Sequence, residues 1–255
     1  MKMPVIFVGH GSPMNAIENN AFTAEWESLG KRLPRPKAIL CVSAHWYTDQ
    51  TKTADNLEPR MIYDMYGFPQ ALYELKYPVK GSARLSNQIV DRLGDLVTID
   101  NRWGIDHGTW SVLCKMYPEA DIPVVQVSVN YNAPAQTHFD IGRKLADLRN
   151  EGILIMGSGN IVHNLSLINW SMAGGYPWAQ EFDDYIKMSI LNRSYDDVVH
   201  FERAGKCAEQ AFYTPDHFYP LLYVLGAADK TERIEVFNDV CSMGSMSMTG
   251  YLFGL

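Results

Sequence analysis

The chain of 255 residues has only four cysteines, and no two of them form a C-x-x-C pair. Zinc-thiolate sites and redox dithiols both need such close pairs, so neither is predicted. Cys41 and Cys114 lie in apolar segments, where reduced core thiols are common.

Basic charge is also scarce. Lys and Arg number 22 against 29 Asp and Glu, a formal charge of -7, and no basic cluster stands out. Because nucleic-acid binding depends on such clusters, we expect no nucleic-acid partner. No run of about 18 apolar residues predicts a membrane span. The N-terminus passes from Met1 into an apolar strand without a cleavage-type segment, so we expect a cytoplasmic protein.

No Ser/Gly/Pro-rich linker divides the sequence, and no internal repeat is found. Apolar residues make up 47% and charged residues 20%, values typical of a globular protein with a sizeable core. We therefore predict a single domain over residues 1–255.

Three short apolar runs each end in a Gly- or Ser-containing turn with a histidine. His10 follows residues 5–9, His45 follows residues 38–44, and His163 comes shortly after residues 153–159. Such runs predict buried strands.

Segments of helical period separate these runs, which predicts an α/β fold with a mostly parallel central sheet flanked by helices. Helices are expected at residues 20–33, 82–93, 109–116, 134–148, 178–191, 195–203 and from Thr214 to about residue 225, and further strands at 97–99, 122–129, 234–237 and 246–253, the last two at a sheet edge.

Ligands of parallel sheets bind beyond the carboxyl ends of the strands, where the connecting loops converge. The histidines should therefore meet there, and imidazole suits zinc, copper, iron and nickel. His217 follows a Thr-Pro-Asp sequence that predicts the first turn of a helix, and His107 lies beside a glycine. His138 and His200 lie in polar helical stretches and are interpreted as structural.

Other motifs are weaker. Gly9-His10-Gly11-Ser12-Pro13 and Gly157-Ser158-Gly159 do not match the G-x-S-x-G of serine hydrolases. The second segment also lacks the pattern of nucleotide-binding loops. Residues 55–78 are rich in aromatics and proline, which indicates either a lid or pocket wall at the site or a loop packed on the core.

Six motifs in order resemble the 4,5-DOPA extradiol dioxygenase family, a branch of the class III extradiol ring-cleavage dioxygenases. They are GHGSPM at 9–14, SAHW at 43–46, GFPQALY at 67–73, DHGTW at 106–110, GSGNIVHNL at 157–165 and PDHFYPLLY at 215–223. The resemblance spans nearly the whole chain. It implies an oxidoreductase that inserts O2 into a catechol ring at a mononuclear non-haem Fe(II), with Zn(II) possible in the purified protein.

The same resemblance implies residue roles. His10, His45 and His217 match metal ligands, and His163 matches a ligand in this branch but an acid/base histidine in more distant relatives. His107 matches a catalytic histidine that contacts substrate or oxygen, with Asp106 as a candidate to fix its tautomer. Many non-haem iron oxygenases use two histidines and a carboxylate; here the third position is His217, and Asp216 and Glu181 are carboxylate candidates.

Two other functions stay open on the sequence alone. A zinc-dependent hydrolase could use the same histidines with metal-bound water as the nucleophile, although no motif supplies its carboxylate base. A non-enzymatic binding protein of the same fold is the third hypothesis.

Overall fold

Alternate residues of β1 (Val5–Gly9) face two different hydrophobic cores. Val5 and Phe7 belong to one core and Ile6 and Val8 to the other, and all four are fully buried. A strand buried on both faces needs apolar residues at every position, which is why this run shows no alternation with polar residues. β1 therefore lies inside a sheet that is covered on both sides.

The structure, a computed structural model, describes residues 2–255. Over these residues the principal sheet has the order β4-β3-β5-β2-β6-β1-β10-β7. Its other strands are β2 (Ala38–Thr48), β3 (Lys52–Thr53), β4 (Thr98–Ile99), β5 (Val124–Asn130), β6 (Ile153–Gly159), β7 (Ile234–Phe237) and β10 (Gly250–Phe253). The central strands β5, β2, β6 and β1 are parallel, whereas β3 and β10 pair antiparallel with their central neighbours. The predicted α/β fold with a mostly parallel sheet is confirmed.

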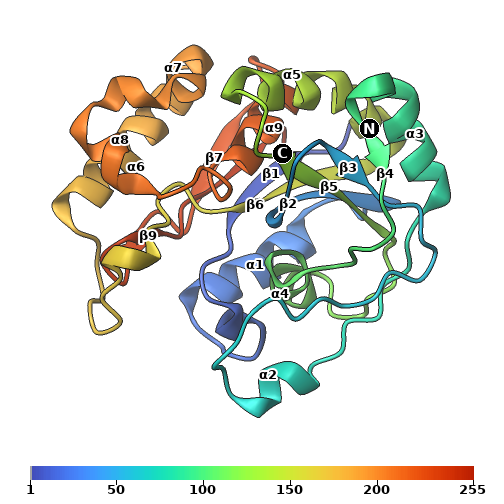
Figure 1. Cartoon of the computed structure of the whole chain (residues 1–255), viewed down its shortest axis with the longest axis horizontal. Coiled ribbons are helices and arrows are strands. Elements are labelled where there is room, and N and C mark those ends of the chain that lie inside the picture. Colours follow the sequence, from blue (N-terminus) through green and yellow to red (C-terminus); the bar gives the residue numbers. More distant parts are fainter. Residues whose placement is uncertain (1) are drawn as a thin grey trace.

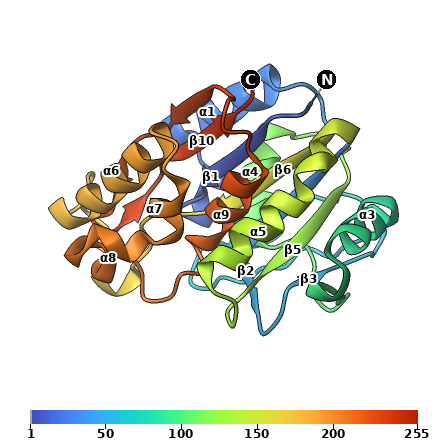
Figure 2. The same ribbon diagram turned by 90° about the horizontal axis from the view of Figure 1, so that it is seen from above.

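Helices cover both faces of this sheet (Figure 1). One face carries α1 (Ala21–Arg32) and α4 (His107–Met116), and the other carries α5 (Ala135–Leu145) and α9 (Tyr219–Ala227), which pack against each other (Figure 2). The remaining helices are α2 (Gln70–Glu74), α3 (Ala83–Leu93), α6 (Pro177–Leu191), α7 (Tyr195–Val199) and α8 (Lys206–Ala211). No helix within residues 2–255 is both long and apolar enough to span a membrane.

Two predictions at the C-terminal end were wrong. The helix expected from Thr214 begins only at Tyr219, because residues 215–218 form a separate turn in which the Phe218 amide donates to the Pro215 carbonyl. The expected strand 246–253 is split into β9 (Met246–Ser247), which pairs with β8 (Cys241–Ser242), and β10. β10 lies inside the sheet between β1 and β7, not at its edge.

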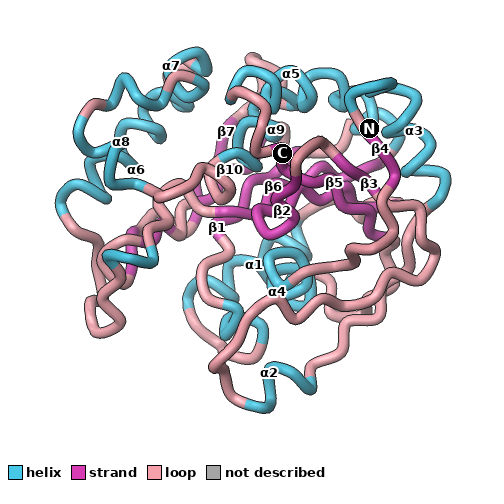
Figure 3. The backbone as a smooth tube through the Cα atoms, viewed as in Figure 1, coloured by secondary structure: helices cyan, strands magenta, loops and turns pink. Residues whose placement is uncertain are grey.

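The aromatic-rich segment between β3 and α3 runs mostly as loop, interrupted by α2 (Figure 3). A bridge between Met61 and Ile105 ties it to the segment that leads into α4. The loop thereby reaches the carboxyl end of the central strands, where the histidines lie.

Candidate active site

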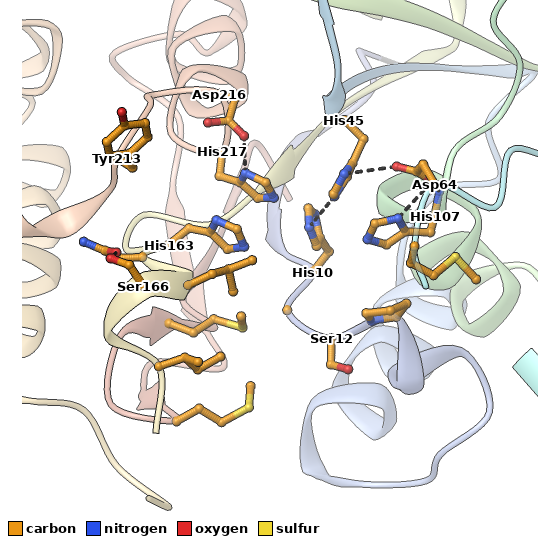
Figure 4. A pocket seen from close by; sticks show the side chains of 18 of the residues that line it. His10, Ser12, His45, Asp64, His107, His163, Ser166, Tyr213, Asp216 and His217 are labelled. Carbon is orange, nitrogen blue, oxygen red and sulfur yellow. Dashed lines mark hydrogen bonds and ion pairs between the residues drawn. The ribbon is translucent and has the colours of Figure 1, made fainter. Parts of the chain in front are cut away.

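His10 and His45 are placed by the two strands on either side of β6. His10 directly follows β1, and its backbone amide donates to the carbonyl of Gly159 at the end of β6. His45 lies in β2 beyond Ser43, the last residue paired with β6, in a stretch where the register with β5 shifts. Such bulges redirect side chains near functional sites, and this one places His45 beside His10 (Figure 4).

Three further histidines complete the cluster. His107 is the first residue of α4, His163 follows β6 and is bridged to Phe212 and Met246, and His217 lies in the turn before α9. The ring of His10 lies 5.9 Å from that of His107 and 5.2 Å from that of His217. The structure thus brings together all five histidines that the sequence analysis singled out for the site.

The Nδ1 atoms of three of these rings are held by oxygen atoms. Nδ1 of His10 lies 3.0 Å from Ser158 Oγ, and Ser158 donates its own proton to the Gly108 carbonyl. His10 must therefore carry its proton on Nδ1. Nδ1 of His45 lies 3.1 Å from Asp64 and Nδ1 of His217 lies 2.6 Å from Asp216, so a carboxylate sets the same tautomer in each.

This tautomer leaves three bare Nε2 atoms directed at one point. His10, His45 and His217 can each offer a nitrogen within 4.8 Å of the others, and the Nε2 atoms of His10 and His45 are 3.2 Å apart. Nε2 of His217 is buried and has no hydrogen-bond partner in the part of the chain that is described. Lone pairs that face each other repel unless a cation lies between them, so the residues present fit a bound metal ion.

Asp64, in the aromatic-rich loop, is a residue that sequence reasoning missed. Its carboxylate lies 3.1 Å from Nδ1 of His45 and 2.9 Å from Nδ1 of His107, and it also accepts the backbone amide of His107. The only sequence signal was its place in a loop already interpreted as a lid or pocket wall. It links a candidate ligand to a candidate catalytic histidine.

Asp106 was expected to set the tautomer of His107, but it does not contact an imidazole nitrogen of that residue. It is the N-cap of α4 and accepts hydrogen bonds from Ser43, Trp103 and Gln126. With the amide and the hydroxyl of Thr109, the carboxylate has five donors, and its task is structural because it fixes the start of α4 to β2 and β5. The carboxylate nearest to Nδ1 of His107 is that of Asp64, at 2.9 Å.

The carboxylate candidates named from sequence have different surroundings. Asp216 faces the cluster and is bonded to His217, whereas Glu181 is exposed on α6 and does not line the cavity. Glu181 is therefore outside the site.

Burial and mutual proximity control protonation in the cluster. Burial, with the nearby His45 and His217, holds the pKa of His10 well below its ordinary value, and burial likewise lowers the pKa values of His107, His163 and His217. Burial opposes the charge on His45 too, but its hydrogen bond to Asp64 and the charge of Asp106 outweigh it and raise that pKa. Neutral imidazoles are the form that binds metal.

Both carboxylates beside the cluster stay ionised. Burial disfavours the charge on each, but His107 and His45 hold the pKa of Asp64 far below its usual range, and His217 lowers the pKa of Asp216 to about 2.

A cavity of about 710 Å³ opens over the histidines. The predicted aromatic-rich loop contributes Asp64, Met65, Tyr66 and Phe68 to its wall, so this loop does form a pocket wall. The opposite side is built from residues after β6 and before α9, among them Trp170 and Tyr213. The volume is suited to a small aromatic molecule.

The two histidines interpreted as structural lie elsewhere. His138 is fully buried on α5, where Nδ1 lies 3.1 Å from the Tyr223 hydroxyl, and burial lowers its pKa to about 4. His200 is about half-buried and contacts Asp196. Neither lines the cavity.

Known proteins similar to this chain are ring-opening enzymes by name. The family model described as the catalytic LigB subunit of aromatic ring-opening dioxygenase matches residues 4–254. A protein of Escherichia coli strain K12 named 4,5-DOPA dioxygenase extradiol is 46% identical over 260 residues, which covers 99% of this chain and 95% of that protein. A protein of Beta vulgaris with the same name is 39% identical over 97% of this chain and 95% of its own length.

One solved structure has the same fold as this chain. The crystal structure of an uncharacterised protein from Escherichia coli K12 superposes with a TM-score of 0.87 at 42% sequence identity, covering 99% of this chain and 100% of that one.

Proposed function

Because the chain belongs to the LigB family of aromatic ring-opening dioxygenases, we propose that it cleaves a DOPA-like catechol with O2 at an Fe(II) ion held by His10, His45 and His217. The family is metal-dependent, and extradiol dioxygenase activity is the function that its members' names carry. The observation that supports the metal site most directly is the convergence of three bare Nε2 atoms at the floor of the cavity.

A metal ion in this position would supply the Lewis acidity that lowers the pKa values of the catechol hydroxyls and the redox chemistry with O2. The three ligands are neutral, so the doubly deprotonated catechol would balance the charge of a divalent ion. Ser158, Asp64 and Asp216 keep the three imidazoles oriented through their Nδ1 atoms.

His163 and His107 are proposed as the proton-transfer groups. Both line the cavity beside the ligand group, and burial lowers both pKa values, so that a neutral imidazole is available to take a proton from a catechol hydroxyl. The cavity wall formed by Tyr66 and Phe68 would exclude water and contact the aromatic ring.

The zinc-dependent hydrolase is the weaker candidate. It needs a carboxylate that can accept a proton from metal-bound water, but Asp64 and Asp216 are engaged by histidine Nδ1 atoms. The relatives named above are dioxygenases.

The test is anaerobic loading with Fe(II), followed by O2 uptake with DOPA and simple catechols and a search for the yellow ring-opened semialdehyde. We expect one O2 consumed for each catechol opened. A protein that holds one metal ion but consumes no O2 with any catechol would contradict the proposal and favour the hydrolase. Zn(II)-loaded protein is the control and should bind catechol without consuming O2.

A further inference from the structure

The cavity wall carries negative charge but no cationic side chain. Of the residues that line it within the described part of the chain, none is Lys or Arg, whereas Asp64 and Asp216 are both present. Their side chains are 15% and 20% exposed, so each is within reach of a bound molecule. Away from the proposed metal ion at the histidines, a carboxylate on a substrate would find no Lys or Arg partner among these lining residues.

The mouth of the cavity is lined by large, exposed, mostly aromatic side chains. Tyr66, Leu165, Trp170 and Tyr213 are 92%, 55%, 69% and 93% exposed. Leu165 and Trp170 lie between β6 and α6, whereas Tyr66 and Tyr213 come from two other connections. Tyr213 lies close to Asp216 in sequence; both line the cavity, on the side of the cluster where His163 and His217 lie (Figure 4). Aromatic faces attract cations, and they also cover apolar groups.

We propose that this mouth selects catechols whose ring substituent is cationic or neutral and disfavours those that end in a carboxylate. The inference rests on the proposed function, because it places the two hydroxyls at the histidines and the substituent at the mouth. There an ammonium group would contact the face of the Tyr213 ring and be attracted by the carboxylate of Asp216. A carboxylate meets like charge and loses hydration without a partner.

Two pairs of catechols separate the effect of the charge of the ring substituent from the effect of its shape. The first pair is 3-(3,4-dihydroxyphenyl)propionate and its amide, which have the same size but differ in charge. The second is 4-(2-aminoethyl)catechol and 4-propylcatechol, which differ by an ammonium in place of a methyl group. DOPA carries both charges and should rank between the amine and the acid.

Two readouts are used. The first is kcat/KM from O2 uptake by the Fe(II) enzyme, and the second is Kd from anaerobic titration, in which no ring can open. We expect the amide to have a kcat/KM about tenfold higher and a Kd about tenfold lower than the acid, and the amine to bind and react at least as well as the propyl compound. An acid bound and cleaved as well as its amide would overturn the inference.

Tyr213→Lys tests whether the preference for substituent charge is set at the mouth of the cavity. Tyr213 is nearly fully exposed, so the change should not affect folding, and we expect it to narrow the amide-to-acid ratio several-fold. Leu57→Lys is the matched control, since Leu57 is 62% exposed and does not line the cavity. An unchanged ratio in Tyr213→Lys, or an equal change in Leu57→Lys, would contradict the assignment.

Failure of the proposed function has a different signature. If no catechol leads to O2 uptake, the dioxygenase proposal fails, while the anaerobic Kd ranking still decides whether the mouth discriminates by charge.

Discussion

The imidazole rings of His163 and His217 are stacked, with centroids 3.5 Å apart and planes only 8° from parallel. The lone pairs of an imidazole lie in the plane of its ring. The lone pairs of these two stacked rings therefore lie in separate, nearly parallel planes and do not converge on one point. This stacking favours a proton-transfer role for His163 beside a metal ion over a role as a metal ligand. The sequence resemblance left both roles open.

The first prediction separates these two roles. His217→Ala should lose the metal, because one of three converging Nε2 atoms is removed. His163→Ala should keep about one equivalent of metal, while kcat falls by roughly 10²–10⁴-fold, the usual contribution of a proton-transfer group. Metal analysis after anaerobic loading and dialysis, with O2 uptake in parallel, measures both.

His200→Ala is the control for this pair, because His200 does not line the cavity and contacts only Asp196 among the acidic residues. It should match the unmodified protein in metal content and rate. Loss of metal in His163→Ala would show that His163 is a ligand after all.

The second prediction concerns Asp64. In Asp64→Asn one amide faces two histidine Nδ1 atoms that now contact carboxylate oxygens, so at least one imidazole loses its acceptor. We expect metal affinity or kcat to fall by about 10–100-fold, as is typical when the partner of a ligand is removed. Asp140→Asn, a change at a partly exposed residue of α5 that pairs with Arg143 and does not line the cavity, should leave metal affinity and kcat unchanged. Full activity in Asp64→Asn would show that this carboxylate does not orient the site.

The third prediction tests how closely the backbone packs against His45. A Cβ atom at Gly108 would lie 2.8 Å from Cδ2 of His45 and 2.9 Å from Oγ of Ser43. Gly108→Ala should therefore displace the imidazole and weaken metal binding by about tenfold or more. Competition with a chelator measures the affinity.

Gly174→Ala is the matched control, because a Cβ atom there meets nothing within 4 Å. Its metal affinity should be unchanged. If Gly108→Ala binds metal as tightly as Gly174→Ala, His45 does not depend on this contact.

The fourth prediction is a pH effect on stability from Asp183, a fully buried residue of α6. Burial raises its pKa to about 6, although hydroxyls of Ser247 and Thr249 donate to it. The unfolded chain loses this proton at lower pH than the folded protein. The contribution of Asp183 to the free energy of unfolding should therefore decrease as pH rises from about 4 to 6, by roughly 3 kcal/mol in total.

Asp183→Asn removes the ionisable group and with it this decrease, so on going from pH 4 to pH 7 its unfolding free energy should change by about 3 kcal/mol in the stabilising direction relative to that of the unmodified protein. Urea unfolding at the two pH values gives the difference, and Asp140→Asn again serves as the control. Parallel pH profiles for Asp183→Asn and the unmodified protein would contradict the assignment.

The sequence alone determined the fold class and the histidines of the site. Buried parallel strands need unbroken apolar runs such as residues 5–8, and their ends must converge, so a histidine after each run could be assigned to one location. The turn before α9 and the splitting of residues 246–253 were not predicted, because the sequence pattern resembles that of a helix N-terminus and of one continuous strand.

Only the tertiary structure decided which groups act on those histidines. Asp64 and Asp106 are both acidic residues in loops, and nothing in their local sequence separates a carboxylate that orients His107 from one that caps α4. The stacking of His163 on His217 and the absence of a cation from the described cavity wall likewise depend on loops distant in sequence. Local propensity fixes strands and helices, whereas partners and charge balance arise only when the chain is packed.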